Sequence, residues 1–229
     1  MKLTDKVVAI TGGSKGFGRA LAEAFIKEGA RVTICALHKD ELEKTGKEIG
    51  ALAVVADVRS EEDMQRFADE TIKKYGALDI WVNNAGIWLP HAVAEDFDMD
   101  QVREMFDINV IGLMNGSRVA LRRMKKQKSG IIINVLSQAA LGNRAGLSTY
   151  AASKWAANGF TKTIREEAQN SGISVFGVYP GGMKTEIFHL GPPVNFNDFM
   201  DTQYVAEKII SNLKLKNPEE ELSIKRPNA

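Results

Sequence analysis

Short runs rich in β-branched residues alternate with longer segments of helical periodicity, and this alternation limits the fold more than any other feature. The expected strands lie at residues 6–11, 31–36, 53–56, 79–82, 130–136, 173–179 and 221–225. The expected helices lie at residues 18–28, 40–49, 61–75, 99–126, 147–170 and 202–215. Each helical segment is long enough to connect two parallel strands. The sequence therefore predicts an α/β fold, a doubly wound sheet of six or seven mainly parallel strands flanked by helices.

Composition indicates one globular domain over residues 1–229, because 44% of the chain is hydrophobic and 26% is charged. A net charge of +1 provides no overall field that would gather nucleic acid or an anionic membrane. We find no signal-peptide core, and no run approaches the roughly 20 apolar residues that span a bilayer. The single cysteine, Cys35, fits a reducing compartment. We therefore expect a cytoplasmic protein without nucleic acid or membrane partners.

A glycine-rich turn, TGGSKGFG at residues 11–18, joins the first expected strand to the first expected helix. Without Cβ atoms, Gly12, Gly16 and Gly18 would permit a tight turn, close approach of a pyrophosphate and close packing of helix on strand. The first amides of the helix would meet the phosphate charge. A glycine-rich turn that binds no ligand is the alternative, but the position between strand and helix favours a dinucleotide site.

The ordered motifs resemble those of the short-chain dehydrogenase/reductase family. Its T-G-x-x-x-G-x-G, N-N-A-G, Y-x-x-x-K and P-G-x-x-x-T patterns match residues 11–18, 83–86, 150–154 and 180–185. The resemblance implies a single-domain Rossmann-type fold and an NAD(P)-dependent oxidoreductase that transfers hydride reversibly between nicotinamide and a carbonyl or secondary alcohol. It also implies a homodimer or homotetramer, assembled through the helices that contain Asn109 and Tyr150.

The choice of cofactor depends on residues near the adenosine ribose. Many dinucleotide folds place an acid at the end of the second strand to hold the 2′-hydroxyl, but this chain has Ala36 there. Lys15, together with His38 and Lys39, would instead attract a 2′-phosphate. Leu37 stands where an arginine is frequent in the family, and His38 and Lys39 also fit a solvated helix entrance. The sequence favours NADP(H), with NAD(H) as the alternative.

The resemblance places most other cofactor contacts at the carboxyl ends of strands, where doubly wound sheets bind ligands. The expected set is Gly12, Ser14, Lys15, Gly16, Phe17, Gly18, His38, Lys39, Asp57, Val58, Asn83, Ala85, Gly86, Tyr150, Lys154, Pro180, Gly181, Met183 and Thr185. Asp57 would accept a hydrogen bond from the adenine amino group, unless it is only a turn residue before a helix. Asn83 would contact the adenosine portion, which is compatible with a second role as a brace for the central sheet.

Four residues are candidates for catalysis. Tyr150 and Lys154 share one helical face, and an adjacent ammonium would lower the tyrosine pKa from its usual value of about 10. Such a pair alone is also typical of an ordinary exposed helix. Ser137, at the end of an expected strand, completes the family's catalytic pattern and would orient a substrate carbonyl. The resemblance adds Asn109, which would support a water-linked proton path to the lysine.

The intact set of Ser137, Tyr150 and Lys154 favours turnover over the alternative function, a non-catalytic NADP-binding sensor or regulatory protein. Segments 88–93, 138–146 and 186–200 would contact a small carbonyl or alcohol substrate, with a substrate loop near residues 181–201. Their aromatic residues, such as Trp88, fit a pocket wall or the core equally well. His91 and His189 lack metal-ligand spacing, so we expect no metal.

Overall fold

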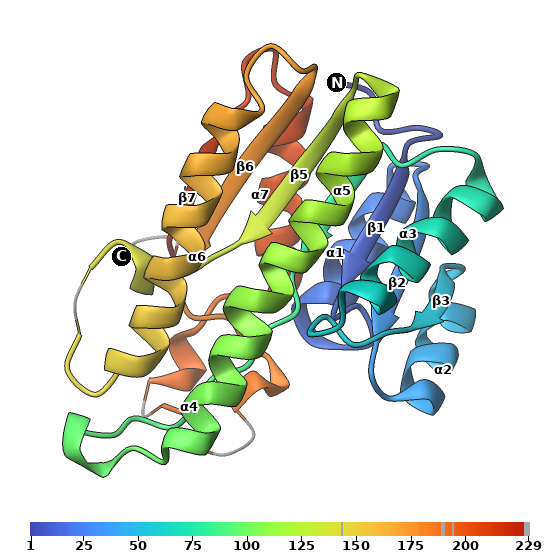
Figure 1. Cartoon of the computed structure of the whole chain (residues 1–229). Helices are drawn as coiled ribbons and strands as arrows, with labels where there is room; N and C mark the ends of the chain where they lie inside the picture. The colour runs from blue at the N-terminus through green and yellow to red at the C-terminus, as the bar shows by residue number, and fades with distance from the viewer. Residues whose placement is uncertain (143, 189–190, 194, 227–229) are drawn as a thin grey trace.

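The computed structural model describes residues 1–142, 144–188, 191–193 and 195–226, and these residues form a seven-stranded parallel sheet (Figure 1). The strands are β1 (Val7–Thr11), β2 (Arg31–Ala36), β3 (Leu52–Val55), β4 (Ile80–Asn83), β5 (Gly130–Val135), β6 (Ile173–Pro180) and β7 (Glu221–Ile224). Their order is β3-β2-β1-β4-β5-β6-β7, and each neighbouring pair is parallel. The prediction of a doubly wound, Rossmann-type sheet is confirmed, and each predicted strand agrees with the observed bounds to within one residue.

Helices cover both faces of the sheet (Figure 1). One face packs against α1 (Gly16–Lys27), α2 (Lys39–Ile49) and α7 (Thr202–Lys214). The other packs against α3 (Glu61–Tyr75), α5 (Leu113–Gln127) and α6 (Ser148–Glu167). Successive residues of β1 illustrate the pattern, because Val8 and Ile10 enter the first core and Ala9 enters the second. Strands buried on both faces explain why these segments are continuous apolar runs in the sequence.

The long helix predicted over residues 99–126 is divided in the structure. It consists of α4 (Met99–Phe106), a π-helical turn (Asp107–Gly112) and α5. The turn brings the chain so close to the loop after β3 that a Cβ on Gly112 would lie 3.0 Å from Cβ of Val58. Single π-helical turns inside longer helices are frequent at functional sites. Sequence periodicity could not show this turn, because its residues continue the helical pattern on both sides.

A buried polar network fixes the centre of the sheet near its carboxyl edge. The Asn83 side-chain amide donates to Ser117 Oγ (2.9 Å) and Asn134 Oδ1 (2.8 Å), and its oxygen accepts from Trp81 Nε1 (2.7 Å). Asn134 in turn donates to Thr161 Oγ1 on α6 (2.9 Å). A satisfied network of this kind favours one arrangement of the elements it joins. It therefore fixes α5 and α6 relative to β4 and β5.

None of the helices in the described ranges is both long and apolar enough to cross a lipid bilayer.

Candidate active site

The glycine-rich turn after β1 adopts a conformation that requires glycine. Gly12 and Gly16 have φ angles of +65° and +53°, in the left-handed region that side chains disfavour. A Cβ on Gly12 would lie 2.9 Å from Cα of Ala85, and a Cβ on Gly18 would collide with the Gly12 carbonyl. The first turn of α1 contains no acidic residue, so its amides present positive potential. This arrangement leaves space beside the backbone for an anion.

Thr11 and Asn84 hold the loop after β4 against this turn. Thr11 Oγ1 accepts hydrogen bonds from the backbone amides of Asn84 (3.0 Å) and Ala85 (3.1 Å). The Asn84 side-chain amide donates to the carbonyls of Thr11 (2.9 Å) and Gly12 (3.1 Å). Neither Thr11 nor Asn84 is in the predicted cofactor set, although both belong to its motifs. Their role is to position the turn.

The residues predicted to select the cofactor lie around one small pocket. It is lined by Lys15, His38, Lys39, Asp40 and Glu41. Lys15 Nζ lies 3.5 Å from Glu41 Oε1, while Ser14 donates from its hydroxyl to Glu41 Oε2 (3.0 Å). The structure thus brings Lys15, His38 and Lys39 together. It adds two carboxylates to the same lining, Asp40 and Glu41, and sequence reasoning missed Glu41 because only the fold places it beside Lys15.

Two predicted contacts with the adenosine portion are already engaged within the protein. Arg59 donates to Asp57 from its backbone amide and from Nε, each at 2.9 Å, and these bonds hold the pKa of that carboxyl below its usual value. An adenine amino group would therefore share the Asp57 carboxylate with Arg59. The Asn83 side chain lies inside the core with its hydrogen bonds satisfied, so a contact with adenosine, which stays a prediction, would come from its backbone. Its second predicted role as a brace is observed.

Ser137, Tyr150 and Lys154 meet at the carboxyl edge of the sheet. Ser137 follows β5, its hydroxyl accepts from the Ala139 amide (3.1 Å), and it lowers the pKa of Tyr150. Lys154 is buried, with Nζ 5.7 Å from the centre of the Tyr150 ring and 3.3 Å from the Val135 carbonyl to which it donates. The predicted triad is therefore a physical cluster.

The electrostatics of this cluster differ from the sequence expectation. Burial raises the pKa of Tyr150 to about 12, although the hydrogen bond with Ser137 acts in the opposite direction. Burial also lowers the pKa of Lys154 to about 8. The Tyr150 pKa is therefore raised in this structure and not lowered as expected, because loss of solvent around the phenolate is the largest contribution. Tyr150 thus holds its proton at neutral pH.

Asn109 occupies the π-helical turn, where its side chain holds the loop after β4. Its amide nitrogen donates to the Ile87 carbonyl (3.0 Å) and Ser153 Oγ (3.2 Å), and its oxygen accepts from the Ile87 amide (2.8 Å). Ser153 then donates to the Tyr150 carbonyl (2.8 Å). A Cβ on the predicted contact Gly86 would lie 3.1 Å from Asn109 Oδ1 and 3.8 Å from Lys154 Nζ. Asn109 is thus a positioning residue next to the lysine, and Ser153 is a partner that sequence reasoning missed.

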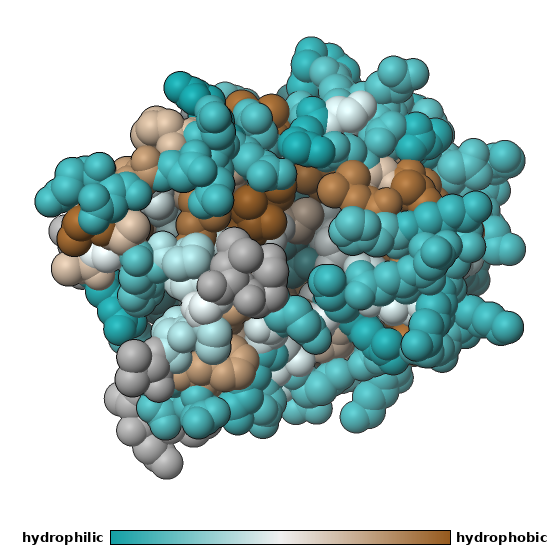
Figure 2. Space-filling model, turned by 90° about the horizontal axis from the view of Figure 1, so that it is seen from below, coloured by the Kyte–Doolittle hydropathy of each residue, from teal (hydrophilic) through white to brown (hydrophobic). Residues whose placement is uncertain are grey.

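A pocket of about 340 Å³ opens beside Ser137 and Tyr150. The predicted cofactor residues Pro180, Gly181, Met183 and Thr185 line it, together with residues from all three predicted substrate segments. Seen from this edge of the molecule, apolar atoms lie in a band between hydrophilic margins (Figure 2). The part of the predicted substrate loop at residues 189, 190 and 194 lies outside the described residues, as does His189.

Aromatic side chains form one wall of this pocket. Trp88 and Phe188 pack edge to face with ring centres 5.0 Å apart, and Phe188 packs against Phe199 at 5.5 Å. Phe196 contacts both of these phenylalanines from behind and does not line the pocket. His91 packs against Trp88 at 5.7 Å. A search of the described part of the chain finds no cluster of three or more His, Cys, Asp or Glu side chains that could hold a metal ion.

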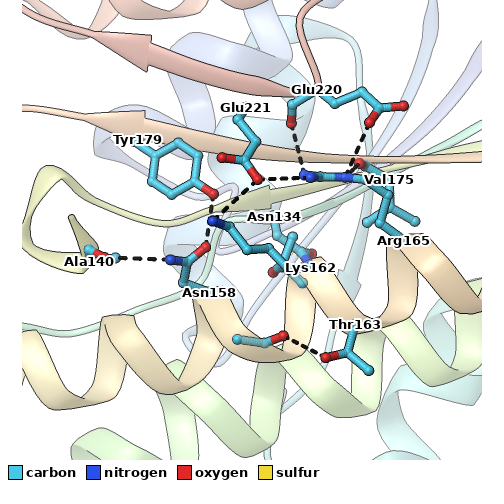
Figure 3. A network of polar contacts seen from close by, with 12 residues as sticks. Asn134, Ala140, Asn158, Lys162, Thr163, Arg165, Val175, Tyr179, Glu220 and Glu221 are labelled. Atoms are coloured by element: carbon cyan, nitrogen blue, oxygen red, sulfur yellow. Dashed lines mark hydrogen bonds and ion pairs between the residues drawn. The ribbon is translucent and has the colours of Figure 1, made fainter.

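The helix that contains Tyr150 and Lys154 is anchored to β6 and β7 by polar contacts (Figure 3). Tyr179 donates to Asn158 Oδ1 (2.8 Å), and Asn158 donates to the Ala140 carbonyl (3.4 Å) just beyond Ser137. Farther along α6, Arg165 donates to Val175 on β6 and Glu221 on β7. These contacts fix α6 relative to the turn that contains Ser137.

Comparisons with known proteins agree with this arrangement. A family model described as short chain dehydrogenase matches residues 6–191. (+)-Borneol dehydrogenase 2 from Salvia officinalis is 35% identical over 192 residues, which cover 82% of this chain and 68% of that protein. A 3-ketoacyl-(acyl-carrier-protein) reductase from Brucella melitensis, solved with NADH, has a TM-score of 0.90 at 28% identity and 97% coverage of both chains. An alcohol dehydrogenase from Thermococcus sibiricus, solved with 5-hydroxy-NADP, has a TM-score of 0.87 at 26% identity, with 98% of this chain and 99% of that chain covered.

Proposed function

Because this chain belongs to the short-chain dehydrogenase family, we propose that it is an NADPH-preferring oxidoreductase that transfers hydride reversibly between nicotinamide and a carbonyl or secondary alcohol. The observation that supports this most is the cluster of Ser137, Tyr150 and Lys154 beside one pocket. A protein that only sensed the nucleotide would have no need for a buried lysine next to a tyrosine and a serine at that place. Turnover is therefore favoured over a sensor or regulatory role.

The residues at the carboxyl edge fit a nicotinamide dinucleotide. Gly12 and Gly16 form a cradle with positive φ angles at the amino end of α1, which suits a pyrophosphate. Pro180, Gly181, Met183 and Thr185 line the pocket next to Tyr150, where they would hold the nicotinamide end. When bound, the nicotinamide would supply or accept the hydride.

The chain's own residues would handle the substrate oxygen and its proton. Ser137 would donate a hydrogen bond to the carbonyl oxygen and thereby orient it. Tyr150, whose pKa is about 12, holds its proton at neutral pH and would donate it to the oxygen as reduction proceeds. Lys154, in its charged form, would stabilise the phenolate that remains. In alcohol oxidation, the phenolate form of Tyr150 would accept the proton, and a pKa of about 12 makes this form scarce at neutral pH.

The preference for NADPH rests on the pocket at the amino end of α2. Lys15, His38 and Lys39 line it, and Ala36 leaves no carboxylate at the end of β2 to repel a phosphate. Asp40 and Glu41 also line this pocket and reduce its positive field, Glu41 through its contact with Lys15. We therefore propose a preference for NADPH rather than exclusive use of it.

We also propose that the chain is a single domain and works as a homodimer or homotetramer in the cytoplasm. The helical segments named for assembly expose large apolar side chains, since Ile111 is 45% exposed and Trp155 is 49% exposed. An apolar face of this kind favours association. The single cysteine, the buried Cys35, supports a reducing, intracellular setting. Light scattering on the purified protein would give the oligomer number, and a monomer at all concentrations would contradict the assembly.

A direct test of this function is a pair of fluorescence titrations with NADPH and NADH, followed by a turnover assay. The assay would follow loss of nicotinamide absorbance over a panel of aldehydes, ketones and diketones. We expect tighter binding of NADPH and turnover of at least one carbonyl class. Failure to bind either cofactor would refute the proposed function.

A further inference from the structure

The charged side chains among the described lining residues of the substrate pocket are of one sign. Arg144 and Arg226 line it, and no aspartate or glutamate is among the described lining residues. The whole chain has a net charge of only +1, so this concentration of positive charge is local. Two guanidinium groups at the wall of a mostly apolar pocket would stabilise a negative charge inside it.

Arg226 is held in place at the pocket rather than extended into solvent. It follows β7, whose Ile224 accepts a hydrogen bond from the Gly181 amide at 3.0 Å. Its guanidinium stacks over the Phe199 ring at 5.3 Å, and its Nη1 forms an ion pair with Asp198 Oδ2 at 3.7 Å, which is longer than a hydrogen bond and compensates the arginine charge only in part. The Arg226 side chain is 31% exposed, whereas that of Asp198 is 66% exposed. A guanidinium has five donors in a fixed fork, so Arg226 retains the geometry to bind an anion.

Arg144 adds to the positive field from the opposite loop. The backbone amide of Ala92 donates to Gly146 (3.2 Å), which joins the loop after β4 to the loop after β5. Both burial and the charge of Arg144 lower the pKa of His91. His91 is therefore neutral at physiological pH, and the positive charge of the pocket comes from the two arginines.

The aromatic wall of the pocket extends to Arg226. Trp88, Phe188 and Phe199 form a continuous surface of edge-to-face rings that leads to Arg226. Such a surface binds flat or bulky apolar groups, while the arginine fork matches carboxylate and phosphate oxygens. Building on the proposed function, we infer that the substrate is an apolar, aromatic-sized carbonyl compound or alcohol with an anionic group, and that Arg226 binds this group.

The test uses two matched pairs of ketones that differ in charge. Benzoylpropionate and its neutral amide, benzoylpropionamide, share a phenyl ketone, and phenacyl phosphate is compared with phenacyl alcohol. Calorimetric binding to the protein saturated with NADP⁺ avoids any dependence on turnover. We expect at least one anionic probe to bind about tenfold more tightly than its neutral partner, as a charge-assisted hydrogen bond provides. The pair that shows the larger preference for its anionic member identifies the group as a carboxylate or a phosphate.

Variants separate binding by Arg226 from a purely structural role. Arg226→Gln should reduce the preference for the anionic probe to about twofold or less, and Arg226→Lys should restore part of it. Arg103→Gln removes an exposed arginine on α4 that pairs with Asp100, so it serves as the control for net charge and should keep the full preference. Higher salt should weaken binding of the anionic probes more than that of the neutral ones.

Three results would overturn the inference. The first is equal affinity for charged and neutral probes, and the second is no binding of either anionic probe. The third is an equal loss of affinity for both members of a pair in Arg226→Gln. The last would mean that Arg226 only supports the Phe199 wall. If neutral ketones are still reduced with NADPH, the proposed function stands and only the inference fails.

Discussion

Lys15 and Glu41 give the sharpest test of cofactor preference, because they place opposite charges in one small pocket. Their side chains are 54% and 40% exposed, so the ion pair itself contributes only about 0–1 kcal/mol. A 2′-phosphate has a charge of about −1.5 to −2, and a lysine contact with it would contribute about 1–2 kcal/mol after solvent screening. Lys15→Ala should therefore weaken NADPH binding about 5- to 30-fold and NADH binding less than about twofold.

Glu41→Gln should change the preference in the opposite direction. Glutamine can still accept the Ser14 hydrogen bond, but it removes the negative charge beside Lys15, so NADPH affinity should rise about 2- to 5-fold. Fluorescence titration with NADPH and NADH measures the ratio of the two affinities in each variant. Lys44→Ala is the matched control, because Lys44 is an exposed lysine on α2 that pairs with Glu48. Equal losses of NADPH and NADH in Lys15→Ala would refute the assigned phosphate contact.

Two further predictions concern the core and the pH profile. Asn83→Ala should lower the free energy of unfolding by about 3 kcal/mol, because it leaves buried polar groups of Trp81 and Asn134 without partners. Urea unfolding measures this change, and a loss below about 1 kcal/mol would contradict the role of Asn83 as a brace. For carbonyl reduction, kcat should fall as pH rises through about 8, since Lys154 then loses the charge that stabilises the Tyr150 phenolate. Tyr150 itself keeps its proton up to about pH 12, so a profile that stays flat above pH 8 would show that the Lys154 charge is not needed.

Periodicity and motif order predicted most of the fold. A strand buried on both faces is visible in the sequence as an apolar run. A helix such as α3 has recognisable residues at both ends, because Ser60 caps its start by accepting from the Asp63 amide and Gly76 ends it in a left-handed conformation. The resemblance to the short-chain dehydrogenase/reductase family predicted that Ser137 would meet Tyr150 and Lys154. The strands and helices themselves depend on residues close in sequence, or on one simple topology rule.

Other features depend on contacts between distant segments, and the sequence did not reveal them. The Asn109 side chain in the π-helical turn bonds to Ile87, which only the folded chain brings near. The inward orientation of Asn83 depends on partners on two other elements. The raised pKa of Tyr150 reflects burial, a quantity that spacing on a helix does not give. The contact of Glu41 with Lys15 likewise depends on two segments that are distant in sequence.

Turnover by Tyr150→Phe tests the central claim most directly, because the substitution keeps the ring and removes only the hydroxyl. We expect NADPH affinity to stay within about threefold of the original value, while kcat for carbonyl reduction falls by about 100-fold or more. Tyr204→Phe, on α7 and away from the pocket, is the control for the loss of a phenol and should retain full activity. Unchanged turnover in Tyr150→Phe would contradict the role of Tyr150 as the group that transfers the proton.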